Sequence, residues 1–437
     1  MKHKLIIYFS LLISIGVFAQ ETPQKFSLKE AISFALENNR HIKNADLNIL
    51  AAKHQVWATT ARGLPQIKGN VDYNFNAVRP FDPEPGDPFL FFFPKHQLTP
   101  SVTLNQLIFD GGYIVGLQSN KVFLEISQNA KDKTTNEVEN QVVNAYNNAL
   151  LTKESVEITK NNINVLKANL EETTKIFENG LIEEEDVEQL KLTLNSLEIN
   201  LRNLQTLHDI SKGYVKILLG IDPNKSIELT DTLEELVDKN ISLSLLTDQH
   251  NIQNNIDYKI AANEAVSKQL EYKLEKSEQL PKINAFLSSN YLGISESFSN
   301  LTKPEQEWLF ITTAGVNISF PIFSSFGGKA KRQRARVEWD IAKNNLIIKE
   351  NQLELDFKNA KTEYNLAIET YQNQQQNLTL AEKIEKKNTI KYKEGIASSF
   401  DLRQAQMQLY GSQQEYLQSI IDVINKKATL KNLLNIK

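Results

Sequence analysis

Side chains that could carry out catalysis or bind a metal ion are few in this chain and lie far apart. Cysteine is absent, which excludes thiolate metal sites, disulfides and cysteine nucleophiles. Gly327-Gly328-Lys329 lacks the spacing of a phosphate-binding loop, and Met407 is the only methionine after Met1, which gives little support to a soft-metal relay. The histidines that follow the expected export signal lack metal-ligand spacing: His41, His54, His96, His208 and His250. We therefore expect no enzymatic activity, no cofactor and no metal site.

One group of acidic side chains could act on ions through charge alone. Its members in the first half of the chain are Glu183, Glu184, Glu185, Asp186 and Glu188, and Asp401 has the equivalent place in the second half. A ring of such acids raises the local concentration of cations. Acids also favour the first turn of a helix, and Ser398 with Asp401 forms an S-x-x-D capping box. A capping role and a pore role are both open at these positions, and they are compatible.

An internal duplication positions these acids, with a period of about 215 residues. Leu64-Pro65-Gln66-Ile67 returns as Leu280-Pro281-Lys282-Ile283, and Gly180 with Asp186 returns as Gly395 with Asp401. The order of the predicted elements is the same in both halves. We expect a signal peptide over 1–19, a first repeat over 20–225, a junction over 226–241 and a second repeat over 242–437.

Each repeat is predicted to contain a long helical hairpin. Apolar or small residues recur in steps of four and three over 138–177, and again over 187–218, which is the pattern of a coiled-coil seam. The second repeat has the same pattern over 353–381 and 402–433. Gly180 and Gly395 are expected to end the first helix of each pair. The first repeat is predicted to have one long helix over 113–179 and shorter helices over 27–62 and 183–219.

Strand pairs are predicted between the helices. Residues 67–77 and 102–108 alternate between apolar and polar side chains, and 283–292 and 316–323 are weaker copies. A half-buried sheet in a soluble protein would give the same pattern. Lys2 and Lys4, followed by an apolar run over 5–18, are typical of an export signal, and 80–100 is a loop rich in proline and phenylalanine. These features favour strands that cross a membrane, since the lengths suit tilted membrane strands.

Four strands cannot close a barrel alone, and open sheet edges are not tolerated in lipid. We therefore expect three copies, which would supply twelve strands and a ring of twelve helices in cross-section. The predicted fold class is a mixed α and β membrane protein: a trimeric channel with a twelve-stranded β-barrel and a long helical barrel.

Paired motifs in this order resemble the TolC family of outer-membrane efflux and secretion channels. The helix-to-strand motifs at 64–67 and 280–283 are similar to that family's, as are the strand-to-helix turns at 109–112 and 321–328. The turns Phe177-x-x-Gly180-Leu181 with Asp186-Val187, and Tyr392-x-x-Gly395-Ile396 with Asp401-Leu402, resemble its periplasmic tip signature. The resemblance covers essentially the whole mature chain.

The resemblance also implies roles for individual residues. The hairpin turns, at Gly180, Leu181, Gly395 and Ile396, would contact a periplasmic adaptor. Candidates for the periplasmic entrance of the pore are Glu183, Glu184, Asp186, Asp401 and Gln404. Gln404 stands where some relatives have a second acidic ring, and Ala397 stands where some have a basic latch. Because these two residues differ from those relatives, the resemblance does not imply the same gating mechanism.

The resemblance implies an outer-membrane channel that extends into the periplasm of a Gram-negative bacterium, with the junction in the equatorial region of the helical barrel. The channel would be a passive exit duct of a tripartite efflux or type I secretion system. Expected partners are two further copies of the chain, a periplasmic adaptor, an inner-membrane transporter and outer-membrane lipid. The 49 basic against 53 acidic residues give a net charge of −4, so no nucleic acid is expected.

Two other classes of protein are alternatives to a channel. A periplasmic adaptor or structural coiled coil would need one hairpin and β-rich flanking domains. An exported enzyme would need a catalytic constellation. The cargo is left open, because the pump selects it.

Overall fold

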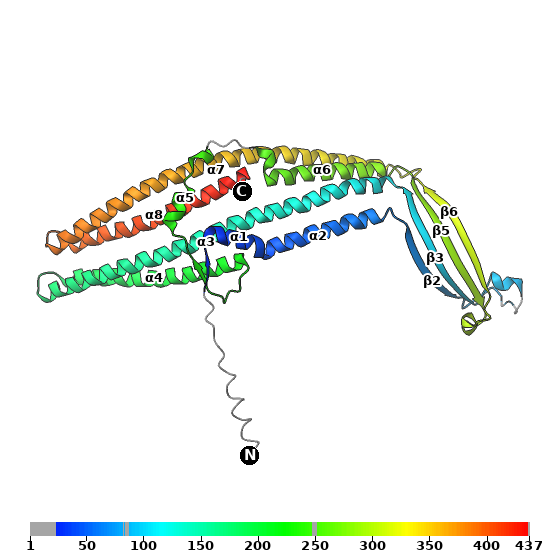
Figure 1. Ribbon diagram of the computed structural model, residues 1–437, viewed down its shortest axis with the longest axis horizontal. Coiled ribbons are helices and arrows are strands. Elements are labelled where there is room, and N and C mark those ends of the chain that lie inside the picture. The colour runs from blue at the N-terminus through cyan, green and yellow to red at the C-terminus, as the bar shows by residue number, and fades with distance from the viewer. Residues whose placement is uncertain (1–22, 82, 84–86, 247–250, 436–437) are drawn as a thin grey trace, which may run out of the picture. The chain divides into compact units, whose positions relative to one another are not determined.

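The computed structural model describes residues 23–81, 83, 87–246 and 251–435 (Figure 1). The predicted signal peptide at 1–19 lies outside these residues. The described chain forms two compact units. Of the described residues, unit 1 contains those within 23–44, 133–246, 251–255 and 353–435, and unit 2 contains those within 45–132 and 256–352. The predicted repeats, with boundaries at 225 and 242, are defined by sequence similarity and not by spatial contacts. The division into units does not test them, so they stay predictions.

The helices are α1 (Leu28–Asn38), α2 (Arg40–Ala61), α3 (Gly111–Glu178), α4 (Glu184–Leu219), α5 (Leu233–Asn240), α6 (Ile256–Ser277), α7 (Gly327–Lys393) and α8 (Ser399–Leu434). The strands are β1 (Gln24–Phe26), β2 (Gln66–Phe75), β3 (His96–Phe109), β4 (Ile227–Leu229), β5 (Lys282–Ser295) and β6 (Trp308–Ser319). The long helix expected over 113–179 and the shorter one over 183–219 are confirmed as α3 and α4.

Unit 1 is built on two helical hairpins, formed by residues 133–178 of α3 with α4 and by residues 353–393 of α7 with α8 (Figure 1). The predicted seams are buried over much of their length: Val142, Ala149 and Leu166 of α3 are nearly inaccessible, as are Leu402 and Val423 of α8. The middle of the α4 seam, at Leu194, Leu197 and Leu201, is only half-buried. Small and branched side chains at heptad spacing let the helices pack closely over this length. The seam pattern therefore predicted both the helices and their buried faces.

Two buried tyrosines fasten the short elements of unit 1 to the long helices. The Tyr146 hydroxyl donates to the carbonyl oxygen of Phe26 at 2.8 Å and lies 3.0 Å from Oδ2 of Asp231. The Tyr364 hydroxyl donates to the carbonyl oxygen of Asn240 at 2.7 Å and accepts from the amide of Ser242 at 2.9 Å. Burial raises the pKa of both phenols, so both stay neutral and keep their donor protons.

The single helix predicted over 27–62 is wrong, because the helix breaks at Asn39. This buried residue has extended ψ (133°). Its side-chain Nδ2 donates to the carbonyl oxygen of Leu218 at 2.7 Å, and its Oδ1 accepts from the backbone amide of His41 at 2.8 Å. Asparagine side chains compete in this way with the helical hydrogen-bond ladder. Gly220 ends α4 beside the break with φ +73°, and a Cβ there would lie 2.7 Å from the carbonyl oxygen of Asn38.

Unit 2 contains a four-stranded antiparallel sheet in the order β2-β3-β5-β6 (Figure 1). The register aligns Val71 with Pro100, and Tyr291 with Phe310. It therefore places these side chains on one largely apolar face: Ile67, Val71, Tyr73, Phe75, Leu98, Val102, Leu104, Ile283, Leu287, Tyr291, Trp308, Phe310, Val316 and Ile318. The opposite face is mostly polar, and Thr103 and Ser288 share a hydrogen bond of 3.0 Å on it. The alternation predicted for these strands is thus confirmed.

The last strand differs from its expected bounds of 316–323. It begins at Trp308 and ends at Ser319, and Pro321, which has no amide proton to donate to a ladder, lies beyond its end. Ser325 and Phe326 then turn the chain into α7 with φ of 50° and 63°.

No helix within the described ranges is both long enough and apolar enough to cross a membrane.

Candidate functional site

The candidate site consists of the two hairpin turns of unit 1, residues 178–186 between α3 and α4 and residues 393–401 between α7 and α8. Both turns use the same backbone geometry. Gly180 has φ +73° and its amide donates to the carbonyl oxygen of Phe177 at 2.8 Å, while Gly395 has φ +72° and donates to that of Tyr392 at 3.0 Å. Glycine is the residue that adopts this left-handed conformation without a steric penalty. The predicted helix ends at the two glycines are therefore confirmed.

Each turn exposes an apolar side chain immediately after its glycine. Leu181 is 76% exposed and Ile396 is 75% exposed. Their amides donate to the carbonyl oxygens of Ile176 and Lys391, which closes the turn and fixes its direction. Each turn thus presents one aliphatic side chain to solvent.

The two turns are tied to each other within one chain. The Ser399 hydroxyl donates to Oδ1 of Asp186. One turn of helix further from the tips, the Thr173 and Tyr392 hydroxyls lie 3.1 Å apart, and burial raises the pKa of Tyr392. The sequence pattern does not predict either contact. Ser399 and Asp186 are 213 residues apart in the chain, and Thr173 is equally well explained as a residue of the coiled-coil seam.

The acidic candidates fall into three environments. Asp186 is partly buried in the link just described. Asp401 is exposed and completes the predicted capping box with Ser398, whose side-chain hydrogen bond keeps the pKa of this carboxyl below its usual value. Glu183, the N-cap residue of α4, makes no side-chain cap and is exposed, as are Glu184 and Gln404. Capping is therefore established for Asp401, and the pore role of all five stays a prediction.

A polar seam runs between the hairpins above the tips. The Asn162 amide of α3 donates to Oε1 of Gln413 of α8 at 2.9 Å. One heptad closer to the tips, Asn169 and Gln406 are both buried, and Nδ2 of Asn169 and both polar side-chain atoms of Gln406 have no hydrogen-bond partner among the described residues. Unpaired buried amides weaken a helix interface, so this level of the seam is less stable than the one above it.

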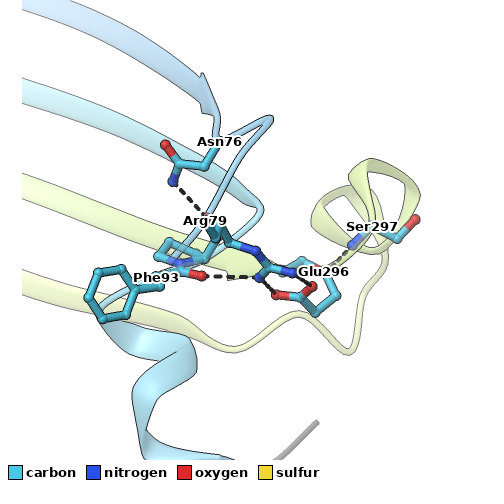
Figure 2. A network of polar contacts seen from close by, with 7 residues as sticks. Asn76, Arg79, Phe93, Glu296 and Ser297 are labelled. Atoms are coloured by element: carbon cyan, nitrogen blue, oxygen red, sulfur yellow. Dashed lines mark hydrogen bonds and ion pairs between the residues drawn. The ribbon is translucent and has the colours of Figure 1, made fainter. Parts of the chain in front are cut away.

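Another polar cluster lies in unit 2, in the loops at the end of the sheet opposite to α2 and α6 (Figure 1 and Figure 2). The Arg79 guanidinium forms a two-pronged ion pair with Glu296, at 2.5 and 2.8 Å, and also donates to the carbonyl oxygen of Phe93 at 3.1 Å. The Asn76 amide side chain donates to the carbonyl oxygen of Pro94 at 2.7 Å. This cluster joins the loop between β2 and β3 to the loop after β5.

No group of three or more histidine, aspartate or glutamate side chains within the described ranges has a geometry that could hold a metal ion.

A protein-family model matches most of the chain. The model of a family described as "Outer membrane efflux protein" matches residues 31–220 and 249–435. No curated protein sequence matches the chain.

Solved structures of outer-membrane channels have the same fold. CusC, described as forming a transmembrane channel, is 17% identical over 93% of this chain and 91% of its own, with a TM-score of 0.75. The outer membrane protein VceC of Vibrio cholerae is 16% identical over 93% and 95%, with a TM-score of 0.74. The CmeC outer membrane channel of Campylobacter jejuni is 16% identical over 93% and 85%, with a TM-score of 0.75.

Proposed function

Because the chain belongs to the outer membrane efflux protein family, we propose that it is the outer-membrane exit duct of a tripartite export system. The family is one of channels, so the chain is not an enzyme. In the proposed assembly three copies form the duct, a periplasmic adaptor meets the hairpin tips, and an inner-membrane transporter delivers the cargo. The duct would sit in the outer membrane of a Gram-negative bacterium and extend into the periplasm.

The observation that carries this proposal is the sheet of unit 2. Its apolar face is exposed on all four strands, with Ile67, Val71 and Val316 more than half accessible. Within the described residues β2 and β6 each have a single strand neighbour. An apolar face and two unpaired edges are both unfavourable in water, and both are satisfied if several copies close a barrel in lipid.

The long helices α3 and α7, which contribute residues to both units, support the same function. Helices of 68 and 67 residues extend about 100 Å at 1.5 Å per residue, which is a suitable length for a duct below a membrane. A periplasmic adaptor, the alternative weighed from the sequence, would have one hairpin, whereas this chain has two hairpins and a four-stranded sheet. The observed elements therefore favour the channel.

Assembly in lipid tests this proposal most directly. Native mass spectrometry of the protein extracted from outer membranes should give three copies, and the same material should conduct ions across planar bilayers. A chain that stays monomeric in bilayers would overturn the proposal, because a four-stranded sheet would then expose unpaired edges to hydrocarbon.

The proposed adaptor contact is tested at the hairpin glycines. A Cβ at Gly180 or Gly395 meets no atom within 4 Å, so a substituted side chain starts in open space, although the positive φ of both residues strains any substitution. Gly180→Trp and Gly395→Trp should each abolish export and leave the trimer assembled. Gly180→Ala and Gly395→Ala are the controls, because they carry the same left-handed backbone penalty of about 1–2 kcal/mol without the bulk. Normal export by both tryptophan variants would refute the contact.

A further inference from the structure

Residues 320–336, between the sheet of unit 2 and the body of α7, combine an apolar half with a basic half. We call this segment the collar. Its first part, 320–326, is apolar and leads from β6 into α7, and its second part forms the first turns of α7. Neither part is explained by the packing of unit 2.

The apolar half exposes most of its large side chains. Phe320, Ile322, Phe323 and Phe326 are between 61% and 89% accessible. Phe326 has φ 63°, a left-handed conformation that is unfavourable for a bulky side chain, and its ring meets that of Phe323 edge to face at 6.2 Å. Strained backbone that displays aromatic rings to solvent indicates a surface that binds something apolar.

The basic half has a charge opposite to the one its helix favours. Residues 327–336 contain five cations and no acid: Lys329, Lys331, Arg332, Arg334 and Arg336. The N-terminal end of a helix carries partial positive charge, so cations in the first turns are unfavourable for the helix itself. An external anionic partner would offset this cost.

Two of these cations are already engaged on the face of α7 that packs against α6. Arg332 donates to Oε1 of Gln279 at 2.8 Å, and the Arg336 guanidinium lies 5.0 Å from the ring centre of Trp339. The other three cations, Lys329, Lys331 and Arg334, are exposed to solvent. Arg334, whose side chain is 81% exposed, pairs with Glu338 within the helix at 3.0 Å, while the exposed Lys329 and Lys331 make no ion pair among the described residues.

The position of the collar suggests which partner supplies the anions. It directly follows β6, whose apolar residues Val316 and Ile318 are more than half exposed near that strand's end. If the sheet crosses a membrane as proposed above, the collar lies where hydrocarbon gives way to phospholipid headgroups. Aromatic rings and cations are the side chains that anchor proteins at this boundary.

We propose that the collar binds anionic phospholipid of the periplasmic leaflet, an inference that rests on the proposed function. The rings at 320–326 lie against the acyl chains at the boundary. Lys329, Lys331 and Arg334 donate hydrogen bonds to the phosphate oxygens, and charge-assisted bonds of this kind are about twice as strong as neutral ones. Each cation close to an anionic membrane surface contributes roughly a fivefold gain in affinity, so three would give about 100-fold if additive.

The test uses the full-length protein in nanodiscs of phosphatidylcholine with phosphatidylglycerol. Native mass spectrometry of the released trimer should show phosphatidylglycerol retained about threefold or more above its share of the nanodisc lipid. The triple variant Lys329→Gln, Lys331→Gln, Arg334→Gln should lose this enrichment. The variant Lys383→Gln, Lys386→Gln, Lys387→Gln is the matched control, because it removes the same charge from exposed positions of the same helix and should retain the enrichment.

Two further measurements distinguish loss of lipid binding from misfolding of the triple variant. Lys329→Arg with Lys331→Arg keeps the charge and should keep the enrichment. Raising the salt from 0.1 to about 1 M should reduce the enrichment of the unmodified protein, because the Debye length falls to about 3 Å.

Each possible result decides the proposal. An inserted trimer without phosphatidylglycerol enrichment, or with enrichment that survives the triple variant, overturns the lipid site and leaves the channel function standing. If the triple variant loses its trimer in pure phosphatidylcholine, the collar contributes to the contact between copies. That result would also overturn the lipid site. A chain that does not enter bilayers at all would overturn both proposals.

Discussion

The ion pair between Arg79 and Glu296 provides the sharpest test of the structure, because it joins two loops distant in sequence (Figure 2). The Arg79 side chain is 6% exposed and that of Glu296 is 30% exposed. We predict that Arg79→Met releases the loop between β2 and β3 from the end of the sheet. Glu296 would lose both of its hydrogen bonds from the guanidinium, and the carbonyl oxygen of Phe93 would lose its donor.

The size of the effect follows from burial. Removing one partner of a fully buried pair costs about 3–5 kcal/mol. Glu296 is partly accessible, so water would solvate its carboxylate once the pair is broken, and we expect about 2 kcal/mol. Because about 1.4 kcal/mol is a factor of ten, the equilibrium constant for local opening of the loop should rise about 30-fold.

Hydrogen exchange measures this opening without unfolding the whole protein. The amides to follow are those of Asn76, which donates to the carbonyl oxygen of Lys95 at 2.9 Å, and Phe93, which donates to that of Phe89 at 3.0 Å. Lys282→Met is the control, since its pair with Glu278 at 3.1 Å is exposed on both sides and should contribute little.

A double-mutant cycle decides whether the pair itself is responsible. Arg79→Met with Glu296→Gln should open the loop less than the sum of the two single effects, because no uncompensated charge remains. Exchange that accelerates less than about threefold, or effects that simply add, would refute the reasoning.

Further predictions concern the tips and the start of unit 1. Asp186→Asn with Asp401→Asn should keep the trimer and reduce its cation selectivity in planar bilayers at low salt; unchanged selectivity would leave both residues with structural roles only. Gly220→Ala should destabilise unit 1 by about 1–3 kcal/mol in thermal melts, whereas Gly213→Ala, inside α4 with open space around its Cβ, should be neutral or stabilising. The pKa of Asp401 is lowered by its bond from Ser398, so amide protection in the first turn of α8 should be full above about pH 4 and fall as pH drops through the lowered pKa; Ser398→Ala should remove this step.

The long helices and their turns were predictable because their signals are local and repeated. A heptad seam specifies helix, length and buried face together, and a single glycine such as Gly180 marks where it ends. The capping box predicted at Ser398 is equally local, and it is confirmed. Exact strand bounds were harder. Residues 308–311 are four apolar side chains in succession, which hides the alternation, and only pairing with β5, as in Tyr291 with Phe310, places them in the sheet.

What the sequence could not reveal are contacts that join distant segments. Asn39 looked like any polar residue in a helix, and its break depends on the carbonyl oxygen of Leu218, contributed by α4. Asp186 looked like a pore charge, and its bond from Ser399 depends on how the two hairpins pack. Such links follow from tertiary structure, and neither residue type nor spacing records them.

The parallel pairing of β1 with β4 constrains the order in which the protein can fold. Gln24 aligns with Ile227 and Phe26 with Leu229, so the first strand has its partner about 200 residues later in the chain. An exported chain folds only after it has crossed the inner membrane, so in the proposed pathway the first strand stays without its partner until residues 227–229 have been exported as well. The Tyr146 hydroxyl, which binds both Phe26 and Asp231, cannot complete its bonds earlier either. The N-terminal end is therefore the part of unit 1 that closes late, after the first hairpin is complete, and Phe26, which is only 6% exposed in the folded chain, stays accessible until then.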